Sequence, residues 1–140
     1  MAGAFENGSM VSTIQEDTLI EHITNEQIEF LSIDKMDYLF LPPISIDKCN
    51  FNKSIHVYTR DGVIIKCSDI TEFYTVNDGW VNVTDLKINH ELVCASGDSF
   101  DSVILIEEHV GEYSMNVINM EFTTNSNNKF GHIVHNILVK

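Results

Sequence analysis

The side chains that could do chemistry in this 140-residue chain are mostly scattered. Cys49, Cys67 and Cys94 lie far apart and form no C-x-x-C motif, which argues against a zinc ribbon or a dithiol redox centre. Of the six histidines only His132 and His135 are close, and a spacing of three on a strand puts them on opposite faces. No pair of carboxylates stands in surroundings typical of acid–base catalysis. The residue types therefore predict no metal site and no cofactor.

Two short polar groups are noted here and taken up again with the family resemblance below. Ser68 and Thr71 lie three residues apart between two apolar segments, and His135 is followed directly by Asn136 near the end of the chain. A hydroxyl does not titrate near neutral pH, so Ser68 and Thr71 can form hydrogen bonds but cannot serve as general acids there.

Charge and length restrict the class of protein. The formal charge is −13, from 21 acidic and 8 basic residues, which argues against a nucleic-acid-binding surface. No apolar run approaches the length of a membrane span. An odd cysteine count without a signal peptide is typical of reduced thiols in the cytoplasm. A single arginine beside seven lysines, with abundant Ile and Asn, suggests an AT-rich source such as a phage or a low-GC microbe.

The length predicts one domain, over residues 12–140. Residues 1–11 carry no charged and apolar leader pattern, and we expect them to be a flexible leader or an expression remnant.

Short strands and frequent turns predict an all-β fold with brief helical turns. The clearest part is residues 63–94: strands at 63–65, 73–76, 80–83 and 92–93, a tight turn at Asn77-Asp78-Gly79 and a helical turn at 84–86. Elsewhere we expect two strands over 21–30, for which a helix is the alternative. Further strands are predicted at 44–46, 55–59, 102–108 and 114–124, with polar loops at 47–54 and 125–128 and a turn at 110–113. A bent strand or strand pair ends the chain at 130–140.

The central stretch resembles the Hint module shared by inteins, bacterial intein-like domains and hedgehog autoprocessing domains. The family pattern is a hairpin, a Thr-x-x-His block, an aromatic-Thr strand, a Gly turn and a closing Leu-Val strand. The matching residues here are Asp61-Gly62, Cys67-Ser68, Phe73-Tyr74-Thr75, Gly79-Trp80-Val81, Asp85-Leu86-Lys87 and Glu91-Leu92-Val93. Asp17–Ile20 and Ile137–Val139 resemble the first and last blocks, so the likeness covers about residues 12–139.

This resemblance implies a compact, horseshoe-like, pseudo-twofold all-β fold whose two termini meet at the active site. It also implies a reaction on the protein's own flanking polypeptide, the exteins, without a cofactor. A first-residue Cys, Ser or Thr attacks the preceding carbonyl, the block histidine helps to protonate the leaving amide nitrogen, and a terminal Asn cyclises and cuts the chain.

The sequence departs from the pattern at the residues that react. Ser68 can stand for the leading Thr of the block, but Thr71 occupies the histidine position. Losing a general acid costs about 10²–10⁴ in rate. Counting back from Asp17 offers Thr13 or Ser12 as nucleophile, although such residues are more often ordinary strand or cap residues.

The C-terminal block has two registers. In one, His135-Asn136 is the cleavage pair, with Asn136 cyclising and His135 assisting. In the other, which we favour, Ile137–Val139 is the apolar strand of the block and His135-Asn136 is only a turn. The sequence thus predicts an intein-like autoprocessing domain impaired by the missing histidine; the alternative is a non-catalytic β-domain used as a structural or protein-interaction module.

Overall fold

The computed structural model describes residues 3–33, 37–120 and 130–140, and these form an all-β fold. The predicted fold class is therefore confirmed. Two single 3-10 turns, η1 (Ile20–His22) and η2 (Val83–Asp85), are the only helical elements in this part of the chain, and no helix in it could cross a membrane. The strands are β1 (Ala4–Phe5), β2 (Met10–Ser12), β3 (Asp17–Leu19), β4 (Ile28–Ser32), β5 (Tyr38–Leu41), β6 (Ser45–Thr59), β7 (Ile64–Cys67), β8 (Glu72–Thr75), β9 (Gly79–Asn82), β10 (Glu91–Val93), β11 (Phe100–Asn119), β12 (Phe130–Val134) and β13 (Ile137–Val139).

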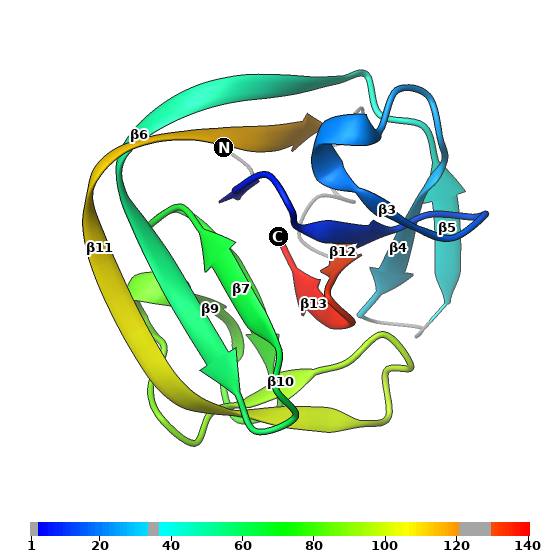
Figure 1. Ribbon diagram of the computed structural model, residues 1–140. Coiled ribbons are helices and arrows are strands. Elements are labelled where there is room, and N and C mark those ends of the chain that lie inside the picture. Colours follow the sequence, from blue (N-terminus) through cyan, green and yellow to red (C-terminus); the bar gives the residue numbers. More distant parts are fainter. Residues whose placement is uncertain (1–2, 34–36, 121–129) are drawn as a thin grey trace.

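Two long antiparallel strands, β6 and β11, form a curved ribbon that arches around the molecule (Figure 1). Their pairing runs from Ser45 opposite Asn119 to Thr59 opposite Val103. The loop predicted at 47–54 and the turn predicted at 110–113 are both wrong, because these residues continue the ribbon. The irregularity between Val110 and Tyr113 is a shift of register within β11, not a reversal of the chain.

The central stretch folds as the sequence predicts. β8 and β9 form a hairpin whose register places Tyr74 opposite Trp80, and η2 follows directly. The Asn82 side chain caps η2 by accepting from the Thr84 amide at 2.9 Å. Residues 21–30 differ from the expected pair of strands: Glu21 and His22 belong to η1, and only β4 is a strand. The loop predicted at 125–128 lies outside the described residues.

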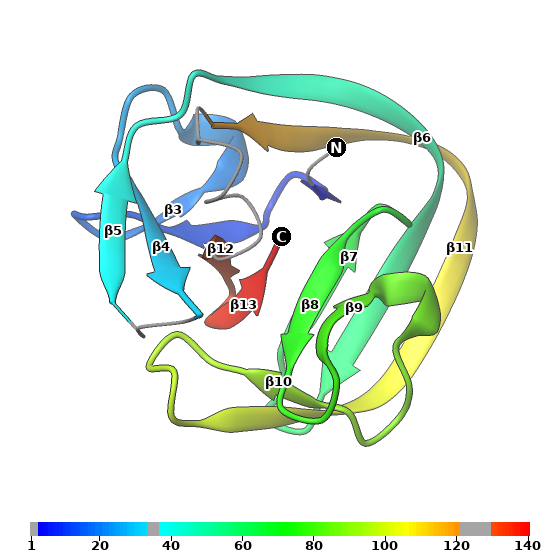
Figure 2. The ribbon, with the colours of Figure 1, turned by 180° about the vertical axis from the view of Figure 1, so that it is seen from behind.

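The expectation of a flexible leader is wrong for residues 3–11. β1 pairs with β11 on one side, Ala4 opposite Val117, and with β7 on the other, Phe5 opposite Cys67. Ala4 and Phe5 are fully buried. The Phe5 ring packs edge-on against the imidazole of His132, with centroids 5.6 Å apart. Figure 2 shows β1 and the end of β13 near each other in the interior of the fold, where Gly3 approaches the Lys140 carbonyl.

The end of the chain is a hairpin of β12 and β13, with Val134 opposite Ile137. His135 and Asn136 form its turn, with φ of 48° and 70°. β13 is completely buried, as the favoured C-terminal register requires. His132, in β12, has no hydrogen-bond partner for Nε2 within the described residues, and burial lowers its pKa to about 4.

We predict that Phe5→Ala lowers the free energy of unfolding by about 3–5 kcal/mol, because it leaves a cavity in the core. Guanidinium denaturation measures the change. The matched control is Phe100→Ala, since Phe100 is 50% exposed on β11; its cost should stay near 0.5 kcal/mol. Equal, small effects at both positions would show that Phe5 is not a core residue.

We predict that Asn136→Gly is nearly neutral, whereas Asn136→Val costs about 1–2 kcal/mol, because a β-branched residue is strained at positive φ. Urea denaturation of the two variants tests this. Asn50→Val is the control, since Asn50 is exposed in the extended strand β6 and a β-branched residue suits that backbone. A loss of stability at position 50 equal to that at position 136 contradicts the explanation.

Candidate functional site at the meeting of the chain ends

The main chain of Ala4 is held by the polar segment that follows β7. Its N–H lies 3.3 Å from both Ser68 Oγ and Thr71 Oγ1, which accept from it. Its carbonyl accepts from the Ser68 amide at 2.9 Å and from the Thr71 hydroxyl at 3.4 Å. The two hydroxyl oxygens are 3.1 Å apart, and both side chains are buried. This segment therefore fixes both polar groups of one buried residue.

The last residue of the chain arrives beside the same point. The Lys140 amide and carbonyl exchange 2.9 Å hydrogen bonds with the carbonyl and amide of Glu72, next to Thr71. A Cβ added to Gly3 would lie 2.8 Å from the Lys140 carbonyl oxygen and 2.8 Å from Thr71 Oγ1. The backbone before Ala4 and the backbone of Lys140 are thus in near contact, which only a glycine at position 3 permits.

The site holds no group that is ionised for attack. Ala4 contributes a methyl group, and Ser68 and Thr71 contribute neutral hydroxyls. The nearest thiol in sequence, Cys67, donates to the Ile55 carbonyl oxygen at 3.5 Å, and burial raises its pKa to about 12. A thiol with that pKa is protonated at neutral pH, so Cys67 is a core residue and not a nucleophile.

The structure brings Ser68 and Thr71 together but places the other predicted site residues elsewhere. The Ser12 hydroxyl donates to Asp17 Oδ1 at 3.0 Å, across the β2–β3 pair. Thr13 forms a bridge to Ile28, and its hydroxyl donates to the Glu16 carbonyl at 2.7 Å. Both hydroxyls serve the β2–β3 turn, and it is Ala4, not Ser12 or Thr13, that lies beside Ser68 and Thr71.

His135 and Asn136 likewise serve the turn of the last hairpin. The His135 amide donates to the Met10 carbonyl, and the Asn136 carbonyl accepts from the Ala95 amide, both at 2.9 Å. Neither residue makes a hydrogen bond to Ala4, Ser68 or Thr71. These hydrogen bonds stabilise the turn between β12 and β13, and they do not bring either side chain to the place where Ala4 and Lys140 meet.

Sequence reasoning missed the residues at the centre of the site: Gly3, Ala4 and Lys140. The sequence does contain a pattern that could have predicted a strand near the start of the chain. Ala4 and Phe5 are apolar, and Gly8, which adopts a φ of 93°, supplies a turn before the apolar Val11. That pattern is typical of a short buried strand, and not of a leader.

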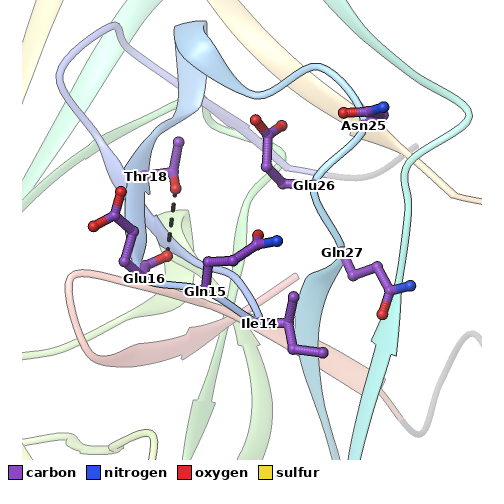
Figure 3. Close-up of a pocket in the computed structure, with 7 residues that line it drawn as sticks. All are labelled: Ile14, Gln15, Glu16, Thr18, Asn25, Glu26 and Gln27. Atoms are coloured by element: carbon purple, nitrogen blue, oxygen red, sulfur yellow. Dashed lines mark hydrogen bonds between the residues drawn. The ribbon is translucent and has the colours of Figure 1, made fainter.

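A surface hollow of about 670 Å³ lies between the turns at 14–18 and 25–27 (Figure 3). Its lining is polar apart from Ile14 and includes none of the residues around Ala4. Within its lining, the Thr18 hydroxyl donates a hydrogen bond to the Glu16 carbonyl oxygen. The hollow is separate from the candidate site.

This all-β fold, in which Ala4 and Lys140 both lie beside the segment at 68–72, matches the intein-like, or Hint, class of fold. The structure superposes on a bacterial intein-like domain from Clostridium thermocellum with a TM-score of 0.83 and 16% identity, over 97% of this chain and 96% of that one. A DnaB intein from Synechocystis sp. PCC 6803 matches with a TM-score of 0.79 and 19% identity, over 98% and 96%. The gp41-1 intein matches with 0.73 and 22%, over 97% and 96%. No family model and no curated protein sequence matches the chain.

We predict that Gly3→Ala destabilises the fold by about 1–3 kcal/mol, because the new methyl group overlaps Thr71 and the Lys140 backbone. In a Thr71→Ala background the cost should fall by at least about 0.5 kcal/mol, a coupling that a double-mutant cycle in urea measures. Ser68→Ala is the control background, because the three atoms nearest to the new methyl group belong to Thr71 and Lys140 and not to Ser68. The contact is disproved if the cost of Gly3→Ala is the same in all three backgrounds.

Proposed function

We propose that this chain is an intein-like autoprocessing domain that acts on its own flanking polypeptide, and that its N-terminal reaction is arrested. The observation that carries the proposal is the contact between position 71 and the Ala4 amide nitrogen. In the resembling family the residue at the position of Thr71 is a histidine that protonates the leaving amide nitrogen. The nitrogen within reach of that position here is that of Ala4.

The Gly3–Ala4 peptide bond is therefore the bond at which an N-terminal reaction would occur. In such a reaction the side chain of the residue at position 4 attacks the Gly3 carbonyl carbon. The C–N bond breaks, the nitrogen takes up a proton and an ester or thioester forms. Alanine has no atom that can attack. The Thr71 hydroxyl does not titrate near neutral pH and cannot serve as a general acid, so nucleophile and acid are both missing.

The arrangement at the other end supports the same assignment. Glu72 pairs with Lys140, so a segment that continues past Lys140 would start beside Gly3. Such a segment and the one before Gly3 are the two flanks that a splicing reaction has to bring together. A C-terminal reaction would involve residues that follow Lys140, because His135 and Asn136 are held in the β12–β13 turn.

The second candidate is a non-catalytic domain that uses the same fold to hold two flanking segments side by side. The observation that favours it is the absence of both reacting side chains at Ala4 and Thr71. The two candidates differ in whether chemistry returns when those side chains are restored.

Restoring the two groups tests the proposal. The full chain is expressed with a folded flanking domain at each end, as wild type, Ala4→Cys, Thr71→His and the double variant. The intact mass is followed with and without a thiol. We expect the wild type and Thr71→His to stay intact. Ala4→Cys should lose its N-terminal flank slowly in thiol, and the double variant about 10²–10⁴ times faster, because a general acid is restored.

Two controls sharpen the result. Ser12→Ala and Thr13→Ala, made in the double-variant background, should leave the cleavage rate unchanged if position 4 supplies the nucleophile. Circular dichroism establishes that each variant is folded. A folded double variant that never releases its flank in thiol rejects autoprocessing and leaves the non-catalytic module as the function.

A further inference from the structure

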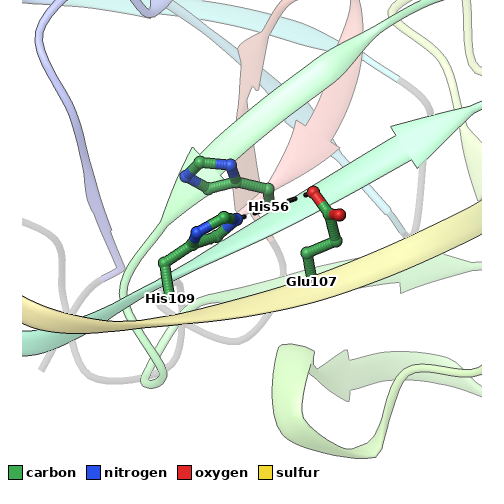
Figure 4. Close-up of side chains that lie close together, drawn as sticks. All are labelled: His56, Glu107 and His109. Carbon is green, nitrogen blue, oxygen red and sulfur yellow. Dashed lines mark ion pairs between the residues drawn. The ribbon is translucent and has the colours of Figure 1, made fainter.

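A second group of polar side chains lies on the β6–β11 ribbon, away from the chain ends. His56 on β6 stands directly opposite Glu107 on β11, and His109 follows two residues later on the same face. One ligand atom from each of the three lies within 4.8 Å of the others. Figure 4 shows the two imidazoles one above the other, with the Glu107 carboxylate beside them.

The two imidazoles lie against each other. Their ring centroids are 4.2 Å apart, at an interplanar angle of 32°. Burial, followed by the neighbouring His109, lowers the pKa of His56, against the opposing effect of Glu6. His109 Nε2 makes no hydrogen bond within the described residues and lies 3.6 Å from Glu107 Oε1. A nitrogen lone pair is the form of imidazole that binds a metal.

The surrounding groups orient these three side chains. The Tyr58 hydroxyl donates to Glu107 Oε1 at 2.8 Å. His56 Nε2 lies 3.3 Å from Glu6 Oε2, which also accepts from the Ser54 hydroxyl. A carboxylate on one ring nitrogen is a common outer partner of a metal-binding histidine, and it leaves the second nitrogen for the metal. Glu6 and Glu107 supply two negative charges, against one positive charge from the neighbouring Lys66.

We propose that His56, Glu107 and His109 form a binding site for one divalent transition-metal ion of the zinc class. Two imidazoles and one carboxylate make up a ligand set that zinc accepts, with a fourth position left for water. Mg²⁺ and Ca²⁺ prefer oxygen ligands alone and are not expected to bind. The side chains of His109 and Glu107 are 42% and 43% exposed, although His109 Nε2 itself is buried. The site is independent of the reaction proposed at Ala4.

Titration of the full chain without a histidine tag tests the site, with a non-thiol reductant present to keep the cysteines reduced. Isothermal calorimetry with ZnCl₂ should give one ion per chain, and CoCl₂ should give the visible absorption bands of tetrahedral Co²⁺. We expect His109→Ala and Glu107→Gln each to weaken zinc binding at least ~10-fold, and Tyr58→Phe, which removes only an outer partner, to weaken it by about 10-fold.

His90→Ala and Cys49→Ser are the matched controls. The His90 imidazole also faces a carboxylate, with Nε2 2.9 Å from Asp78 Oδ2, but it belongs to no three-ligand group in the described part of the chain. Cys49 tests whether a thiol captures the metal. Both controls should bind zinc as the wild type does. The proposal is overturned if the wild type takes up no zinc, or if folded His109→Ala and Glu107→Gln bind it unchanged.

Discussion

The backbone of Ala4 sits between three other segments, and the arrangement of both chain ends depends on the hydrogen bonds it makes there. Its side chain is a single methyl group, so it is the pairing with β11 and the contacts to Ser68 and Thr71 that hold it. An unpaired amide at this depth would cost about 1–3 kcal/mol. The hydroxyls of Ser68 and Thr71 therefore have a structural role, because they satisfy the buried polar groups of Ala4. A hydroxyl that forms hydrogen bonds to buried main-chain groups stabilises the fold whether or not the domain cleaves a peptide bond.

The sequence allowed prediction of the parts of the fold that are governed by local signals. The β8–β9 hairpin has its turn residues between alternating strands, and the buried strand Ile137–Val139 is a plain apolar triplet. The ribbon was misjudged because much of β6 and β11 is exposed and polar, and its strand character comes from pairing between distant residues. The same reason hid β1, because two residues are too few to show a period and their partners lie far along the chain.

The protein has two kinds of polar side-chain cluster, one buried where the chain ends meet and one on the β6–β11 ribbon. At the chain ends the polar atoms are buried and hydrogen-bonded to one another. The hydroxyls of Ser68 and Thr71 are therefore already used in hydrogen bonds within the fold. On the ribbon, alternation places His56, Glu107 and His109 on one face without burying them completely. Such side chains keep lone pairs that the fold itself does not use. That difference separates a group that maintains structure from one that is able to take a ligand.

The pairing of β1 has a consequence for the time at which the protein becomes complete during synthesis. Asn116 donates to the Phe5 carbonyl across 111 positions of the chain. At a translation rate of roughly 5–20 residues per second, β1 waits roughly 6–20 s for that partner. Until then β1 can pair only with β7, where Phe5 stands opposite Cys67, and its pairing with β11 is missing. The meeting point of the ends is thus built last, and it forms only in a chain that has been made almost to its final strand.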